Sequence, residues 1–86
     1  MTALHEILIT RAVRPDGTPH ANAFRATLGG EGETICVSET PFFDTVRILL
    51  ARGLAAHKDL LVMRHAGSDA IALKGRVGVA AWIARS

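Results

Sequence analysis

The stretch "SETPFFDTVRILLARG", residues 38–53, predicts the helix around which the rest of the fold is arranged. Thr40 is a candidate N-cap, Pro41 suits the first helical position, and Gly53 stands where a helix would end. Apolar side chains recur at helical spacing between these ends, at Phe42 or Phe43, Val46, Leu49, Leu50 and Leu54. Charged side chains fall on the other side, at Asp44, Arg47 and Arg52. We therefore expect an amphipathic helix that covers one face of a sheet.

Three short strands are expected before this helix. Residues 7–13 are rich in β-branched side chains and end at the turn sequence "RPDGTP". Residues 22–28 alternate apolar and polar side chains, which is the period of a half-buried strand. The segment "GGEGE" then forms a turn, and residues 34–38 form the third strand. These segments predict an antiparallel meander.

The alternation of side chains predicts how the second and third strands pair. If Leu28 faces Ile35 and Ala26 faces Val37, one face of the meander is apolar. The other face is then small and polar, with Thr27 beside Cys36 and Arg25 beside Ser38. We expect the helix to cover the apolar face.

A fourth strand is predicted at residues 60–65, which are too few for a helix and rich in Leu and Val. Ser68 or Asp69 is a candidate cap for a short helix through Leu73. Gly75 and Gly78 would each cost about 1 kcal/mol in a helix interior, which favours a last strand at residues 77–83. The expected fold is α+β: a small antiparallel sheet of about five strands, in the order βββαβ and then the last strand, packed on one main helix.

The composition is that of a single domain, residues 1–86, with one core. Apolar residues make up 49% of the chain and aromatic residues 5%, so the core must be mainly aliphatic. The net charge of +2 comes without a polybasic run. The start of the chain lacks the features of a signal peptide, and no stretch approaches the roughly 20 apolar residues of a membrane span. The single cysteine, expected to be half-buried on a strand, fits a reducing compartment, and we expect a cytoplasmic protein.

The segment "LLVMRHAGSD", residues 60–69, resembles the histidine phosphatase signature through Arg64 and His65. That chemistry needs a second histidine and several guanidinium groups around the phosphoryl oxygens, and no histidine follows His65. The four histidines also lack the spacing that lets a helix present two metal ligands. We therefore predict no enzyme activity, no catalytic residue, no metal site and no cofactor.

Basic side chains provide an alternative function, the binding of nucleic acid. Arg11, Arg14 and Arg25 belong to one predicted hairpin. Further cations follow in the carboxy-terminal third, at Arg64, Lys74, Arg76 and Arg85. A fold that brings them together would form a basic patch able to contact phosphates, although the sequence predicts no aromatic stacking platform beside it.

Two segments, "TPFFDTVRILLARG" and "LLVMRHAGSDAIALKGRVGVAA", resemble short proteins of alphaproteobacterial genomes and their prophages. Those proteins share a Pro-led helix ending in Arg-Gly, a "MRHAGS" segment and a "VG-x-AA" step. The resemblance covers residues 40–81 and implies a phage or mobile-element setting. Small proteins from such a setting look like anti-CRISPR inhibitors, and this chain is loosely similar to the inhibitors of type I systems. That similarity implies an inhibitor that keeps a surveillance complex from binding DNA or from recruiting its nuclease.

The preferred function is therefore non-enzymatic, stoichiometric binding to a host protein complex, with CRISPR effector subunits as the suspected partners. The candidate contacts are charged side chains outside the expected core: Arg11, Arg14, Arg25, Glu31, Glu33, Arg64 and Arg76. Nucleic-acid binding through the five arginines of this set is the alternative, and a structural subunit of a phage or bacterial complex stays open. The protein is expected to be a monomer or a weak homodimer.

Overall fold

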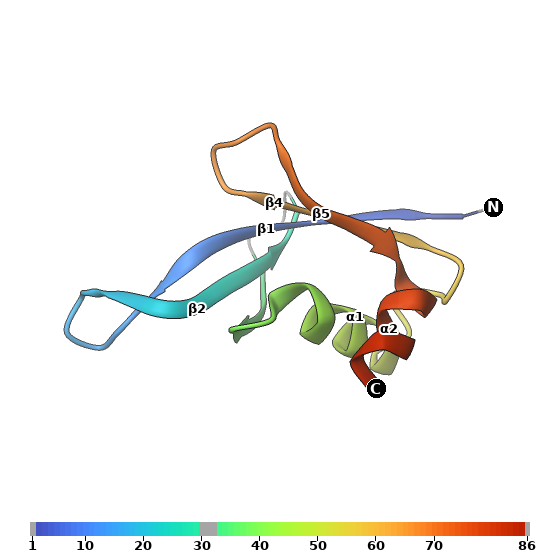
Figure 1. Cartoon of the computed structure of the whole chain (residues 1–86), viewed down its shortest axis with the longest axis horizontal. Helices are drawn as coiled ribbons and strands as arrows, with labels where there is room; N and C mark the ends of the chain where they lie inside the picture. The colour runs from blue at the N-terminus through green and yellow to red at the C-terminus, as the bar shows by residue number, and fades with distance from the viewer. Residues whose placement is uncertain (1, 30–32, 86) are drawn as a thin grey trace.

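A computed structural model of the chain describes residues 2–29 and 33–85. In this part of the chain, five strands form one sheet and two helices pack on it (Figure 1). The elements are β1 (Leu4–Val13), β2 (Pro19–Leu28), β3 (Thr34–Ser38), α1 (Pro41–Ala51), β4 (Leu60–His65), β5 (Ile71–Arg76) and α2 (Val77–Arg85). The α+β class is thus confirmed.

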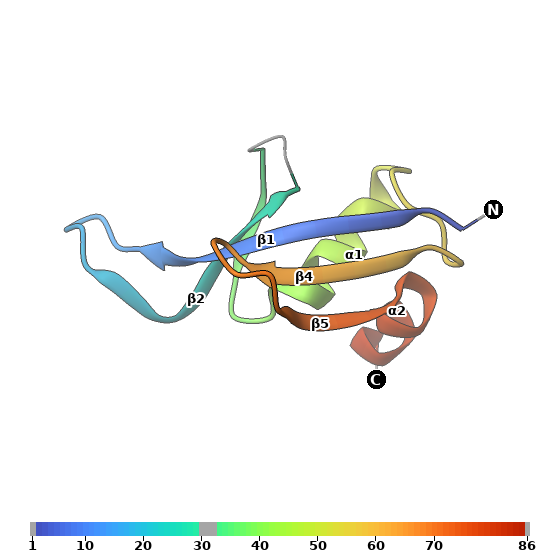
Figure 2. The same ribbon diagram turned by 90° about the horizontal axis from the view of Figure 1, so that it is seen from above.

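The sheet has the strand order β3-β2-β1-β4-β5, with β1 at its centre (Figure 2). Both helices lie on the same side of it, and the β1–β2 hairpin extends beyond the rest of the molecule (Figure 1). The expected sheet was antiparallel throughout, which is wrong for one pair, because β4 runs parallel to β1. After the meander, β3 points in the same direction as β1, and α1 carries the chain back across the sheet. The next strand therefore has to run parallel to β1.

The core lies between the sheet and the two helices. It is formed by buried aliphatic side chains of the sheet and by the inner faces of the helices: Ile7, Ile9, Ala26, Leu61, Phe42, Val46, Leu49, Val77 and Ala80. The odd-numbered residues of β1 and β4 and the even-numbered residues of β2 point into it. Because side chains alternate along a strand, the opposite set of residues faces away from the helices.

Helix α1 begins and ends where the sequence predicts. Thr40 occupies the N-cap position, although its side chain makes no capping hydrogen bond, and Pro41 is the first helical residue. At the other end Gly53 adopts a φ of 70°, which lets the backbone turn out of the helix. Leu54 was expected on the apolar face of the helix but is 52% exposed, because the chain has already left the helix at that point.

The predicted register between β2 and β3 is wrong by one residue at Ala26 and by two at Thr27, which pairs with Thr34 and not with Cys36. Ala26 pairs with Cys36 and not with Val37, and the pairing shifts again between Ala26 and Thr27. This irregularity, a β-bulge, inserts an unpaired residue into one strand and so breaks the simple alternation. As a result Cys36 packs against the core, while Val37 is 54% exposed.

The carboxy-terminal assignment was also wrong. Residues 71–76 form strand β5, where a short helix was expected, and residues 77–85 form helix α2, where the last strand was expected. Gly75 is not in a helix at all but lies in β5 against Phe42, whose ring would be 3.6 Å from a Cβ added at residue 75. Gly78 is the second residue of α2, where the helix passes close to another backbone segment. Gly78 therefore marks a close approach of two backbone segments, whereas a Cβ at position 75 would make only an ordinary contact with Phe42. Neither glycine excludes a helix after residue 76.

Helix α2 is attached to the loop between α1 and β4 by backbone hydrogen bonds. The amide of Gly78 donates to the carbonyl oxygen of His57 over 2.8 Å, and the amide of Val77 donates to that of Asp59 over 2.8 Å. A Cβ at position 78 would lie 2.9 Å from the oxygen of His57. The helix can come this close only because residue 78 has no side chain.

The carboxylate of Asp59 fastens the same loop to the start of β1. It accepts hydrogen bonds from the amides of Ala56 and Ala3, at 2.9 and 3.1 Å, and its Oδ2 lies 2.9 Å from Nε2 of His5. These hydrogen bonds hold the pKa of the Asp59 carboxyl far below its ordinary value. The bond from the amide of Ala56 has the largest effect, and the bond with His5 has the next largest. The ionised side chain thus ties together the first strand and the segment that receives α2.

Candidate functional site

The face of the sheet that points away from α1 and α2 is the candidate functional site, and we call it the open face. Figure 2 views the molecule from this side, with the helices behind the sheet. The strand pairing assigns the following residues to it: Leu4, Glu6, Leu8, Thr10, Arg25, Thr27, Val37, Leu60, Val62, Arg64, Lys74 and Arg76. No helix among the described residues covers this face.

Four of these residues are cationic and one is anionic. Arg25 comes from β2, Arg64 from β4, and Lys74 and Arg76 from β5, whereas Glu6 is the single carboxylate. The register places Glu6 and Lys74 in one row across the strands, since both pair with Val62. The open face is therefore basic, although the net charge of the chain is only +2.

Arg64 is held in place by its neighbours. Its Nε lies 3.0 Å from Oε2 of Glu6, close enough to pair the charges but without the alignment of a hydrogen bond. Its Nη1 donates to the carbonyl oxygen of Asp69 over 3.2 Å. The guanidinium is therefore held on the surface by contacts within the chain.

The other three cations extend into solvent. Arg25, Lys74 and Arg76 are exposed, and within the described part of the chain they make no side-chain hydrogen bond or ion pair. Long cationic side chains of this kind attract an anionic surface and lose few internal contacts when they bind it.

Aliphatic side chains fill the centre of the open face. Val62 is only 3% exposed, and Leu8 and Leu60 are half-buried between the strands. At the end of the same face Leu4 is 66% exposed. The described aromatic side chains lie elsewhere: Phe24, Phe42 and Phe43 pack from the helix side, and Trp82 projects from α2. The surface thus combines aliphatic side chains on β1 and β4 with cations on β2, β4 and β5.

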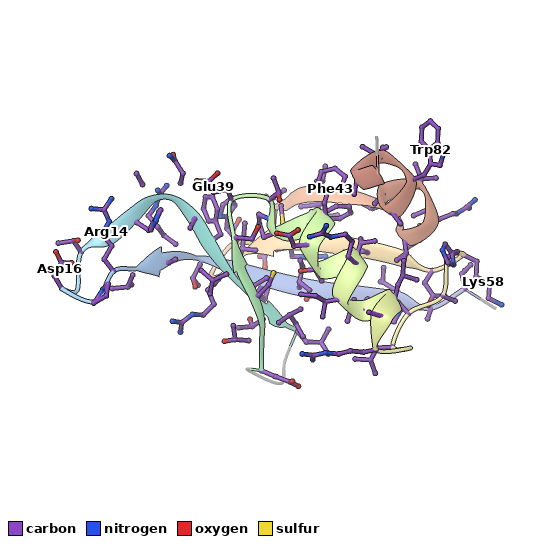
Figure 3. All side chains as sticks on the ribbon, turned by 90° about the horizontal axis from the view of Figure 1, so that it is seen from below. Arg14, Asp16, Glu39, Phe43, Lys58 and Trp82 are labelled. Carbon is purple, nitrogen blue, oxygen red and sulfur yellow. The ribbon has the colours of Figure 1, made fainter. Side chains whose placement is uncertain are left out.

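The predicted hairpin arginines do not all belong to this face. Arg11 points the other way, with its guanidinium 5.3 Å above the ring of Phe24. It also donates to the carbonyl oxygens of His20 and Ala21, at 3.1 and 2.7 Å, and so stabilises the hairpin. Arg14 lies at the exposed tip of that hairpin, beside Asp16 (Figure 3).

The two predicted glutamates do not join the site either. Glu33 lies on the helix side, where its Oε1 is 3.6 Å from Nη1 of Arg52, and Glu31 lies outside the described residues. Of the predicted contacts, the strand pairing therefore places Arg25, Arg64 and Arg76 on one face, with Arg25 and Arg76 towards opposite ends of it. Lys74 joins them, and its place could have been found from its even-numbered spacing with Arg76 along β5.

The residues that resemble a phosphatase motif have separate environments. His65 is exposed at the end of β4, and its ring packs edge-on against Phe24 with 6.1 Å between the centroids. The guanidinium of Arg64 pairs with Glu6 on the opposite side of the strand. Across residues 2–29 and 33–85 no three His, Cys, Asp or Glu side chains gather in a way that could hold a metal ion.

Cys36 is half-buried on β3, as expected from the sequence. Its Sγ lies 3.6 Å from Oγ1 of Thr45 on helix α1. Burial raises the pKa of this thiol above its ordinary value, so the reactive thiolate forms less readily than at a solvated cysteine.

In the described part of the chain, neither helix has the length and apolar character needed to cross a bilayer. Comparisons of the chain with protein-family models, with curated proteins and with solved structures give no match.

Proposed function

We propose that this chain is a non-enzymatic binding protein that docks its open face on an acidic surface of a partner protein. One observation carries the proposal: the face of the sheet that the helices leave uncovered carries four cations beside a partly buried aliphatic centre. A basic surface of this kind is complementary to carboxylates of a partner.

The mixed character of the open face favours protein over nucleic acid. Protein interfaces have an apolar centre with a polar rim, and Arg is enriched in them. Leu8 and Leu60, which lie beside the buried Val62, supply the centre, and Arg25 and Arg76 belong to the rim. Sequence-tolerant binding of single-stranded nucleic acid relies on aromatic platforms, and the described open face carries none.

The members of the face have different roles in this proposal. Arg64 is already oriented by Glu6 and Asp69, so it loses little conformational freedom when it meets a carboxylate. Lys74 and Arg76 are solvated and act mainly by steering association. A partner that covers the whole face would form an interface of about 1,200–2,000 Å², the usual size for a specific complex.

The finer proposal concerns the partner. The resemblance of residues 40–81 to short phage-associated proteins supports an anti-CRISPR protein that binds a type I surveillance complex and blocks DNA binding or nuclease recruitment. The charge of the open face directs this proposal to an acidic protein surface of the complex.

The experiment mixes the purified protein with a panel of purified type I surveillance complexes and follows co-elution and target-DNA binding. We expect binding that persists at moderate salt with at least one complex. Lys74→Glu should weaken it about tenfold or more, whereas Lys58→Glu, the same charge reversal at an exposed loop residue outside the open face, should not. Absence of binding to every complex, or equal loss in both variants, would refute the proposal.

Nucleic-acid binding is the second candidate, and the gathering of Arg25, Arg64 and Arg76 on one face favours it. A gel-shift titration of duplex DNA at low salt tests it. A binder that neutralises about three phosphates should show a slope near −3 in a plot of log affinity against log salt. No shift at low salt would exclude this function.

A further inference from the structure

Helix α2 carries apolar side chains on both of its sides. Val77 and Ala80 are buried in the core, but Val79, Trp82 and Ile83 are 56%, 71% and 49% exposed. Spacings of three and four residues place the exposed three on one stripe. Helices that are apolar all round are normally enclosed, so this stripe has the character of a contact surface.

Two adjoining cavities lie beside this stripe, between α1 and α2. The larger, of about 410 Å³, is lined by Arg47, Leu50, His57, Gly78, Ala81 and Trp82. The smaller, of about 300 Å³, is lined by Thr40, Phe43, Asp44, Arg47, Ile83 and Ala84. Arg47 lines both, so they form one depression, which we call the α2 groove. Figure 3 shows this side of the molecule, with Trp82 projecting from α2 and Phe43 between the helices.

We propose that the α2 groove is the interface of a homodimer in which Trp82 of each copy enters the larger cavity of the other. A patch that contacts its own copy across a two-fold axis has to be complementary to itself, and a projecting group next to a cavity that can receive it meets this condition. The α2 groove meets this requirement, because the exposed indole stands directly at the wall of a cavity of about 410 Å³. A second copy of this chain is therefore the occupant that fits.

The chemistry of the cavity suits an indole ring. The guanidinium of Arg47 lines it and is held from one edge by Asp44, with Nη2 2.7 Å from Oδ1. A guanidinium held at its edge keeps a flat side for stacking, and Trp is the strongest partner for such cation–π contacts. Leu50 and Ala81 supply apolar walls around the ring. A buried Trp removes about 150–250 Å² from water, and the contact occurs twice in a symmetric dimer.

The expected dimer is weak and leaves the open face accessible. One short stripe from each copy gives an interface at the small end of specific complexes, so we expect a dissociation constant on the order of 10 µM. The α2 groove lies on the helix side of the sheet, whereas the four cations of the open face lie on the other side. The inference therefore goes beyond the proposed function and does not depend on it.

Sedimentation equilibrium over about 1 µM to 500 µM tests the proposal, since this range brackets the expected constant. The mass should rise with concentration from 9.2 kDa towards twice that value. Trp82 is the only tryptophan and the chain has no tyrosine, so its fluorescence reports the same event. The emission should shift to the blue as the indole leaves water. A mass of 9.2 kDa at every concentration would overturn the proposal.

Two variants assign the contact. Trp82→Ala should raise the dissociation constant at least tenfold, on the order expected for a central aromatic contact. Val13→Ala, at a 59% exposed residue of β1 outside the α2 groove, should dimerise like the wild type. Circular dichroism checks that both variants fold. If Trp82→Ala does not fold, Val79→Asp replaces it and should likewise prevent dimerisation. Association that survives in the folded α2 variant would contradict this interface.

Discussion

Replacing Gly78 by alanine sets helix propensity against packing, and the two make opposite predictions. Alanine is more favourable than glycine by about 1 kcal/mol in a helix interior, which is an upper limit for Gly78 in the first turn of α2, so propensity alone predicts a more stable protein. In the structure, a Cβ at this position would lie 2.9 Å from the carbonyl oxygen of His57 and 3.1 Å from its Cβ. These atoms belong to the backbone or are rigidly attached to it, so they cannot rotate away.

Packing should win this competition. Moving α2 to relieve the overlap costs about 1–3 kcal/mol by analogy with overfilled cores. The movement also stretches the hydrogen bonds from Gly78 to His57 and from Val77 to Asp59, each worth about 0.5–1.5 kcal/mol. Against a propensity gain of about 1 kcal/mol, the net result is a loss of about 1–3 kcal/mol in the free energy of unfolding.

Urea denaturation followed by far-UV circular dichroism measures this loss. For a small domain the slope is about 1 kcal/mol per molar urea, so the midpoint should fall by about 1 M or more. Gly75→Ala is the matched control, because its Cβ would meet only Phe42 at an ordinary contact distance of 3.6 Å. The control should be as stable as the wild type or slightly more stable. If Gly78→Ala were as stable as Gly75→Ala, the close approach of α2 to the loop would be refuted.

Three further predictions concern the core, the loop anchor and the thiol. Leu61→Ala should lower the free energy of unfolding by about 2–5 kcal/mol because Leu61 is fully buried, whereas Leu73→Ala, at a 40% exposed residue, should cost clearly less in the same urea assay. The pKa of Asp59 is lower in the folded protein than in the unfolded chain, so its contribution to stability is complete above the unfolded pKa of about 3.9 and is lost as the pH falls. In thermal melts, the melting temperature of Asp59→Asn should therefore fall less on acidification than that of the wild type. Because burial raises the pKa of Cys36, its thiol should react with a thiol reagent at about pH 8 more slowly in the folded protein than in urea, and equal rates would contradict its packed environment.

The sequence correctly predicts those helices and strands whose ends are marked by turn or cap residues. Pro41 and Gly53 delimit α1, and residues 60–65 form the predicted strand, because these signals act locally on the backbone. The carboxy-terminal assignment failed because glycine was judged by helix propensity alone. Gly78 is needed where α2 passes over His57, and that contact joins residues that are far apart in the sequence.

The composition of the open face depends on which strands pair and in which register, and a single sequence predicts this only in part. Arg25, Arg64 and Arg76 were all predicted contacts, but their meeting on one face follows from the parallel β1–β4 pair and from the β4–β5 register. The predicted β2–β3 register assumed unbroken alternation, but the pairing shifts between Ala26 and Thr27, so no single register fits both sides of this bulge. Arg11 differs from Arg25 for a simpler reason, since the strand pairing points their side chains to opposite faces.

The most direct test of the open face is a cross-saturation measurement by NMR with methyl-labelled protein bound to a purified type I surveillance complex. Saturation of the complex should reduce the methyl signals of Leu4, Leu8 and Leu60, which lie on the open face. The methyl signals of Val79 and Ile83 on α2 should keep their intensity. Loss confined to α2, with the open-face signals unchanged, would contradict the account.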